Sequence, residues 1–196
     1  MELVLMAPRI LAFSGSARNG SVNQQLVSAA ARAAEQAGAE VTVVSLKDFE
    51  MPLFDQDLEA ESGAPENATR LKQLFFEHDG LLISSPEYNS SVTPLLKNAI
   101  DWVSRAAEGE APCQAYHGKI AGLMAASPGG LGGLRGLVHL RAILGNIGVT
   151  VVPDQIAVPT AFDAFDDSGN LKDERQQAAI AKIAGSVVTM CEKLKS

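Results

Sequence analysis

Five short runs of apolar residues, separated by longer segments of helical periodicity, constrain the fold of this chain more than any other feature. The runs occupy residues 10–14, 41–45, 80–85, 119–127 and 149–153. They alternate too little between apolar and polar residues to be strands with one wet face, and they are typical of a parallel sheet covered on both sides. Five successive βα units therefore predict an α/β fold with an open, doubly wound sheet and helices on both faces.

The intervening segments predict helices at residues 23–37, 65–77, 93–106, about 133–147 and 173–195. Thr93 and Pro94 stand where a helix prefers an N-cap and a first residue. Cys191 shares one helical stripe with apolar residues, so we interpret it as part of the core. The acidic, turn-rich segments 57–65 and 162–174 are interpreted as solvated loops. The length of 196 residues favours a single domain, residues 1–196.

Charge and cysteine content exclude several classes of protein. Lys and Arg number 16 against 23 Asp and Glu, a net charge of −7 that repels nucleic acid and anionic membranes. Two distant cysteines and three histidines suggest neither a disulfide framework nor a metal site. No run is long enough to span a membrane, and Pro8 and Arg9 interrupt the first apolar stretch before it could act as an export signal. These features predict a cytoplasmic protein.

The loop after the first apolar run, residues 14–23, resembles an anion-binding turn. Glycines at 15 and 20 allow the backbone to curl, and the N–H groups of the following helix can point at a phosphate. Side chains that could add donors or charge are Ser16, Arg18, Ser21 and Asn23. An ordinary turn with a capping serine is the alternative interpretation of this segment.

The sequence lacks two well-known phosphate-binding motifs, and their absence limits which phosphate compounds the loop could bind. Gly15 and Gly20 have P-loop spacing, but Ser21 and Val22 stand where Lys and Ser or Thr would hold phosphates and Mg²⁺. The dinucleotide pattern G-x-G-x-x-G is also absent. These mismatches favour a single phosphate monoester.

Two further loops are predicted at the same edge of the sheet, because the carboxyl ends of parallel strands meet there. After the third run, Pro86 ends the strand and presents Glu87, Tyr88 and Asn89, which could border a flat heterocycle. The alternative is a solvated Glu87 and a Tyr88 that covers the core. After the fourth run, the glycine-rich segment 127–135 permits close backbone approach to a ligand, or is simply a flexible turn.

From Arg9 to Ser196 the chain resembles the NAD(P)H-dependent FMN reductase family of flavodoxin-like proteins, which includes quinone, azo-dye and chromate reductases. The resemblance rests on segments 15–23, 85–102 and 127–135. It implies strand order 2-1-3-4-5, an FMN cofactor and NADPH or NADH as hydride donor. It also implies a small-molecule electron acceptor and a homodimer or homotetramer, in which the loop 52–57 approaches the neighbouring subunit.

The resemblance assigns residues to parts of the cofactor. It implies that the FMN phosphate is held by Ser16, Arg18, Ser21 and Asn23. It places the isoalloxazine ring against Pro86, Glu87, Tyr88 and Asn89, with Ser127, Gly129 and Gly130 on the far side. No catalytic side chain is implied, because the flavin carries the hydride chemistry.

Two other functions remain as alternatives. The first is a flavodoxin-like FMN electron carrier that does not oxidise nicotinamide directly. The second is a phosphate-ester hydrolase built on the first loop, although no cysteine, aspartate pair or metal cluster accompanies Ser16 and Arg18. The pattern G-x-S-x-G of α/β-hydrolases is absent as well.

Overall fold

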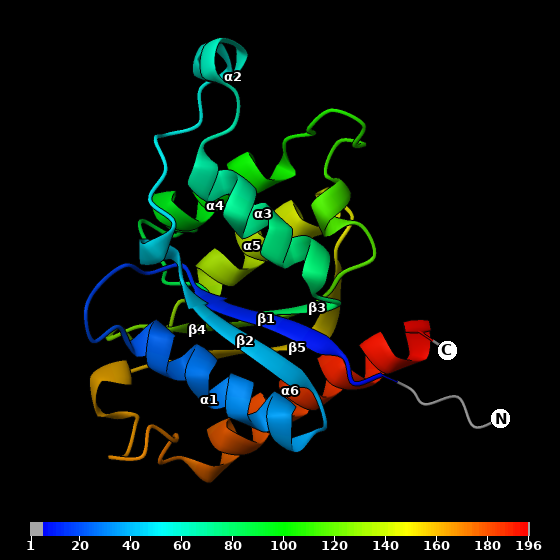
Figure 1. Ribbon diagram of the computed structural model, residues 1–196. Coiled ribbons are helices and arrows are strands. Elements are labelled where there is room, and N and C mark those ends of the chain that lie inside the picture. The colour runs from blue at the N-terminus through cyan, green and yellow to red at the C-terminus, as the bar shows by residue number, and fades with distance from the viewer. Residues whose placement is uncertain (1–5, 196) are drawn as a thin grey trace, which may run out of the picture.

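The computed structural model describes residues 6–195 and contains one five-stranded parallel sheet (Figure 1). The sheet order is β2-β1-β3-β4-β5, so the fold class and strand order expected from the sequence are confirmed. The strands are β1 (Arg9–Ser14), β2 (Glu40–Ser45), β3 (Gly80–Ser84), β4 (Ile120–Ala126) and β5 (Thr150–Val158).

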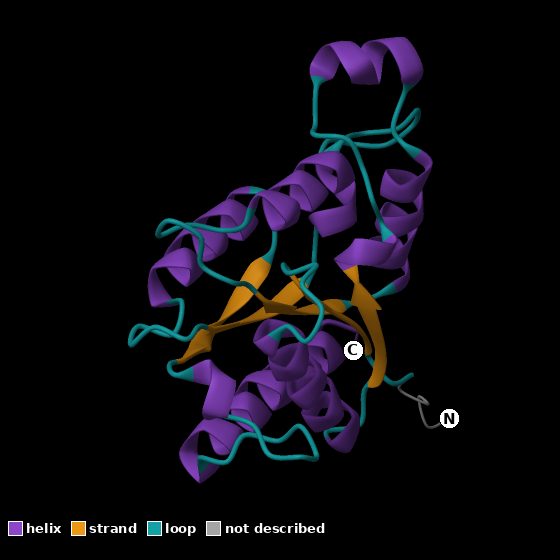
Figure 2. Cartoon of the chain, turned by 90° about the vertical axis from the view of Figure 1, so that its left-hand side faces the viewer, coloured by secondary structure: helices purple, strands orange, loops and turns teal. Residues whose placement is uncertain are grey.

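Helices cover both faces of the sheet, as Figures 1 and 2 show. On one face lie α1 (Val22–Gln36) and α6 (Glu174–Lys195), and on the other lie α3 (Glu66–Glu77), α4 (Pro94–Ser104) and α5 (Leu134–Asn146). Short 3₁₀ turns occupy Leu46–Asp48, Gln114–Tyr116 and Ala161–Asp163. Thr93 caps α4 as predicted, and its hydroxyl also donates to the carbonyl of Gly15 at 2.7 Å. The start of α4 is thereby joined to the loop after β1.

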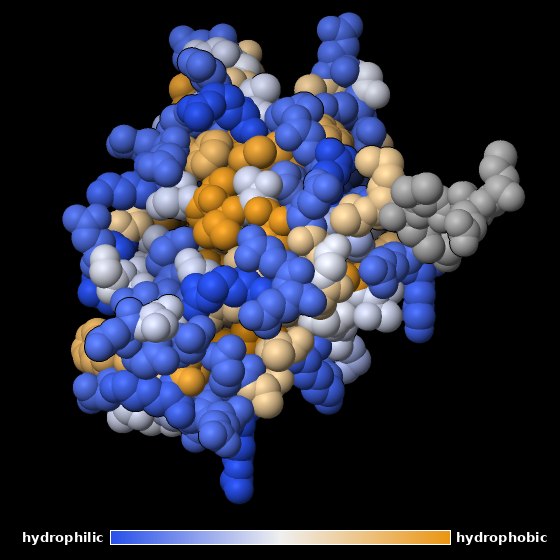
Figure 3. Space-filling model, turned by 60° about the horizontal axis from the view of Figure 1, so that its bottom comes forward, coloured by the Kyte–Doolittle hydropathy of each residue, from blue (hydrophilic) through white to orange (hydrophobic). Residues whose placement is uncertain are grey.

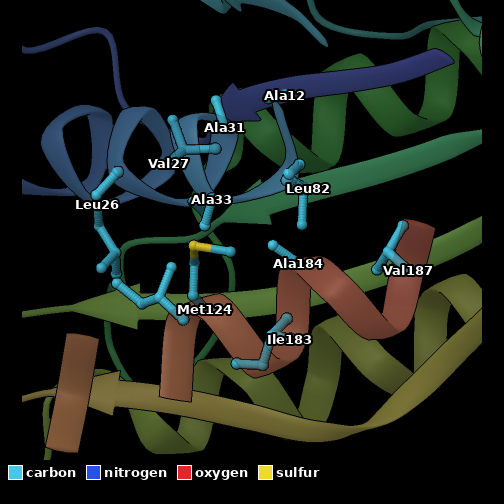
Figure 4. Close-up of a cluster of buried hydrophobic side chains, with 14 of the residues drawn as sticks. Ala12, Leu26, Val27, Ala31, Ala33, Leu82, Met124, Ile183, Ala184 and Val187 are labelled. Atoms are coloured by element: carbon cyan, nitrogen blue, oxygen red, sulfur yellow. The ribbon is translucent and has the colours of Figure 1, made fainter. Parts of the chain in front are cut away.

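Each face of the sheet has its own hydrophobic core, which explains why the central strands are continuously apolar. Between the sheet and α1 and α6, the strand residues Leu82 and Met124 share one buried cluster with Ile183 and Val187 of α6 (Figure 4). Gly122 permits this close packing, because a Cβ there would lie 2.7 Å from the side chain of Ile183. The sheet is therefore a rigid base for the loops at its carboxyl edge.

Two elements differ from the sequence-based expectation. The acidic segment expected as a loop contains α2 (Gln56–Ser62), whose first N–H groups are capped by Asp55. This helix buries no residue and stands away from the body (Figures 1 and 2), so it lacks the apolar stripe by which helices are recognised. Strand β5 continues past Pro153, because the proline lies within a register shift that needs no ladder hydrogen bond from it.

The surface is largely polar on the face shown in Figure 3, with one apolar patch near its centre. None of the helices formed by residues 6–195 has the length and apolar character required to cross a bilayer.

Candidate functional site

A cavity of about 140 Å³ opens at the carboxyl edge of the sheet. It brings together the three loops predicted from the sequence and adds a fourth from the segment after β5. Predicted residues that line it are Ser16, Arg18, Ser21, Asn23, Pro86, Glu87, Tyr88 and Ser127. Residues not predicted are Val22, Ala126, Pro128 and Phe162. The predicted residues Asn89, Gly129 and Gly130 do not line the cavity, although they lie in the same loops.

The first loop presents a set of unused backbone donors. Among residues 17–23, Arg18 alone has an N–H with a hydrogen-bond partner in the described chain, the Ser16 hydroxyl at 3.3 Å. The Ser21 hydroxyl caps α1 by accepting from the Gln24 N–H at 3.4 Å. The remaining N–H groups lie at and before the amino end of α1, where the helix dipole favours an anion. Ser21 therefore caps the same helix end at which the unbonded N–H groups could bind an anion.

The Asn23 side chain is already occupied by bonds within the protein. Its amide donates to the Ala126 carbonyl at 2.8 Å and accepts from the Ala126 N–H and the Ser84 hydroxyl, each at 2.9 Å. The residue is 3% exposed. Asn23 thus ties the first turn of α1 to the ends of β3 and β4, and its backbone N–H is the group left to face a ligand.

The second loop forms a tight hairpin turn. Tyr88 and Ser91 exchange two backbone hydrogen bonds, at 3.0 and 3.1 Å. The two residues between them, Asn89 and Ser90, both have left-handed backbones with φ of 50° and 68°. Asparagine tolerates this conformation better than most residues, and strained turns of this kind are found at binding sites. The turn holds Tyr88 at the cavity with 53% of the residue exposed.

Glu87 is anchored to the first turn of α5 and is not solvated. Arg135 donates to its carboxylate from Nε at 2.8 Å and from Nη2 at 2.5 Å, and the Gly136 N–H donates at 3.1 Å. Burial raises the pKa of the Glu87 carboxyl, but the Arg135 and Gly136 hydrogen bonds and the Arg135 charge outweigh it and lower that pKa. Glu87 is therefore an anion that positions its loop.

The glycines of the third loop fall into two pairs with different surroundings. Gly132 and Gly133 have positive φ, and a Cβ on either would strike neighbouring atoms at 2.7 or 2.8 Å. Gly130 has open space around it, and Gly129 meets only the Ser127 hydroxyl. The later pair therefore shapes the loop, and the earlier pair leaves its backbone open.

Phe162 begins the segment 162–174, which was expected to be a solvated acidic loop. It is 67% exposed, and the Arg18 guanidinium lies 6.0 Å from its ring centre. The signal that could have found it is topological, because any residue directly after β5 reaches the same sheet edge.

A parallel sheet of order 2-1-3-4-5 defines a flavodoxin-like fold, and the unbonded N–H groups after its first strand are suited to a phosphate ligand. The family model for NADPH-dependent FMN reductases matches residues 8–163. The chain belongs to this family, and the resemblance inferred from its three loops is confirmed.

Named relatives agree with this assignment. An NAD(P)H-dependent FMN reductase of Pseudomonas aeruginosa is 35% identical over 174 residues, covering 88% of this chain and 89% of that protein. An NAD(P)H:quinone oxidoreductase of Solanum tuberosum is 32% identical over 196 residues, covering 95% and 94%. Among solved structures, the flavoenzyme NAD(P)H:(acceptor) oxidoreductase FerB from Paracoccus denitrificans has a TM-score of 0.80 and 26% identity, covering 95% of this chain and 98% of that one.

Proposed function

We propose that this protein is an FMN-containing reductase that oxidises NADH or NADPH and passes the electrons to a small-molecule acceptor, with quinones as the leading class. The observation behind this proposal is that unbonded N–H groups at the start of α1 and the exposed ring of Tyr88 line one cavity. FMN combines a phosphate with a flat ring system. Free flavins, azo compounds and metal oxyanions such as chromate are further candidate acceptors. The free thiols Cys113 and Cys191 fit a reducing compartment, and we propose the cytoplasm.

The residues present fit FMN in both parts. The N–H groups of residues 19–23, with Arg18 and Ser16, suit the phosphate ester. Pro86, Tyr88 and Ser127 line the cavity and suit the ring. Asn89, Gly129 and Gly130 lie just outside the cavity in the same loops, where they would reach only the edge of a larger ligand. A cavity of about 140 Å³ is smaller than the roughly 300–1,000 Å³ of pockets that enclose whole ligands. The cavity would therefore enclose only part of the FMN molecule.

Bound FMN supplies reversible hydride and electron transfer. The residues around the cavity would hold and orient the cofactor, and nicotinamide and the acceptor would react with it there. The Glu87 carboxylate accepts hydrogen bonds from Arg135 and Gly136, so its role is to fix the position of its loop. We assign it no proton transfer.

Anaerobic mixing with reduced nicotinamide tests the proposal. The FMN-loaded protein is expected to lose its visible flavin absorbance rapidly with NADH or NADPH, and to regain it when a quinone is added. A protein that binds FMN but keeps its colour for minutes would instead be an electron carrier. A protein that stays colourless after incubation with FMN and desalting would refute both assignments.

Arg18→Ala is expected to weaken FMN binding by about 1.5–3 kcal/mol, the scale of a lost charge-assisted hydrogen bond. Within residues 6–195 the Arg18 side chain makes no hydrogen bond, and its guanidinium lies over the Phe162 ring. The unfolding free energy should therefore change little. Fluorescence titration of the apoprotein measures the affinity, and an unchanged dissociation constant would remove Arg18 from the phosphate site.

We also propose that the chain is a homodimer or homotetramer, with the segment 52–57 and α2 at a subunit contact. Leu53 is 76% exposed, and α2 buries nothing in the isolated chain. We expect light scattering to report at least a dimer, and Leu53→Lys to shift the population toward monomer, because a charge is costly to bury in an interface. A monomeric wild-type protein would refute the proposal.

A further inference from the structure

Phe162 is the most exposed aromatic residue among residues 6–195, and it lines the cofactor cavity. It belongs to the 3₁₀ turn Ala161–Asp163, which follows β5 and lies beside the amino end of α1 (Figure 1). Two-thirds of the residue is in contact with solvent, so its ring buries little surface and adds little to the stability of the fold.

The backbone fixes the place of Phe162 at the cavity. Thr160 has a left-handed backbone with φ of 46°, a conformation that β-branched residues rarely adopt. Ala161 is fully buried, and its N–H donates to the Ser127 carbonyl at 3.1 Å. The N–H of Ser127 donates in turn to the Val158 carbonyl, also at 3.1 Å. The loop after β5 is thereby joined to the loop after β4, and backbone strain of this kind clusters at ligand sites.

Hydrogen bonds also hold the chain that follows Phe162. The Lys172 N–H donates to the Ala164 carbonyl at 2.9 Å, which closes the segment between them. The Arg32 guanidinium, from α1, donates to the Gly169 carbonyl at 2.8 Å. The backbone is therefore tied down on both sides of Phe162 before any ligand binds.

The ring of Phe162 lies next to the guanidinium of Arg18. Among the described residues that line the cofactor cavity, Arg18 is the only cation. Its guanidinium lies 6.0 Å from the centre of the Phe162 ring, within the range of a cation–π contact. Within residues 6–195 the Arg18 side chain has no hydrogen bond or ion pair. Fixing a free arginine side chain on a ligand costs rotamer entropy, and the ring lowers this cost by restricting the side chain beforehand.

We propose that Phe162 is a positioning residue for FMN, whose ring holds the Arg18 guanidinium at the cavity for the phosphate ester. This inference rests on the function proposed above. Because the ring acts through Arg18, its effect on affinity should require the phosphate of the ligand. It should also require an aromatic side chain, since an aliphatic one has no negative face to attract the guanidinium.

Fluorescence titration of the apoprotein with FMN and with riboflavin, which lacks the phosphate, tests the role of Phe162. We expect Phe162→Leu to weaken FMN binding by about two- to fivefold, the scale of an exposed cation–π contact, and to leave riboflavin binding unchanged. Phe162→Tyr keeps the ring and should keep the wild-type FMN affinity. Equal weakening of FMN and riboflavin by Phe162→Leu would overturn the inference, because the ring would then act on the flavin itself.

Phe76→Leu is the matched control. Phe76 is also an exposed phenylalanine with a cation near its ring, the Lys72 ammonium at 5.8 Å, and it lies outside the cofactor cavity. The affinity for FMN should not change in this variant. A loss equal to that of Phe162→Leu would contradict a role specific to Phe162.

A double-mutant cycle on Arg18 and Phe162 gives an independent decision. In an Arg18→Ala background, Phe162→Leu should no longer change the FMN affinity, because the guanidinium on which the ring acts is absent. The same loss in both backgrounds would overturn the inference. An unchanged FMN affinity of Phe162→Leu in the wild-type background would refute this inference alone. A wild-type protein that binds no FMN would refute the proposed function as well.

Discussion

Gly132→Ala is expected to lower the free energy of unfolding by about 3 kcal/mol or more. The φ of Gly132 is +62°, and an added Cβ would lie 2.7 Å from the backbone carbonyl carbons of Ala157 and Val158. Backbone atoms of a paired strand cannot rotate away as a side chain can, so the loop or β5 must shift. Urea denaturation of the apoprotein, followed by circular dichroism, measures the loss.

Gly130→Ala is the matched control within the same loop. Its backbone has no positive φ, and nothing lies within 4 Å of the added Cβ. We expect a change in unfolding free energy within about 0.5 kcal/mol. Equal stability of the two variants would contradict the close contact between Gly132 and the backbone of β5.

Asn23→Leu is expected to lower the free energy of unfolding by about 2–5 kcal/mol, because it leaves several buried polar groups without partners. The orphaned groups are the N–H and carbonyl of Ala126 and the hydroxyl of Ser84. Leucine keeps a similar volume, so the loss reports hydrogen bonding more than a cavity. FMN affinity should also fall by about tenfold or more, because the backbone donors of the first turn of α1 lose their fixed position.

Asn19→Ala is the control for Asn23→Leu, because it removes an asparagine side chain from the same loop without disturbing buried hydrogen bonds. Asn19 is exposed, and within residues 6–195 its side chain accepts a single hydrogen bond, from Lys47 at 3.1 Å. Its unfolding free energy should stay within about 0.5 kcal/mol of the wild type. A stable Asn23→Leu protein with unchanged FMN affinity would contradict the assigned role of Asn23.

Those parts of the fold that depend on hydrophobic pattern and topology could be predicted from the sequence. Buried strands between two helical layers must be continuously apolar, and the carboxyl ends of parallel strands share one edge. These two rules locate the sheet and bring residues as distant as Ser16, Glu87 and Ser127 into one cavity.

The individual tasks of the site residues could not be predicted, because they depend on partners distant in sequence. Asn23 is a polar residue in an anion-binding loop, and its side chain bonds to Ala126, 103 residues away. Glu87 is anchored by Arg135 in the same manner. The residue types suggest ligand contacts, and the tertiary hydrogen bonds turn these side chains inward.

Helix α1 contributes both to the cofactor site and to the hydrophobic core, so cofactor binding affects how stable the folded protein is. The helix starts in the cofactor cavity, and its body lies in one of the two cores, where Ala30 and Ala34 are fully buried. A ligand that binds only the native state at about 100 times its dissociation constant adds about 2.7 kcal/mol of stability. Protein loaded with its cofactor should therefore resist proteases far longer than empty protein, so that flavin supply sets how much of it persists.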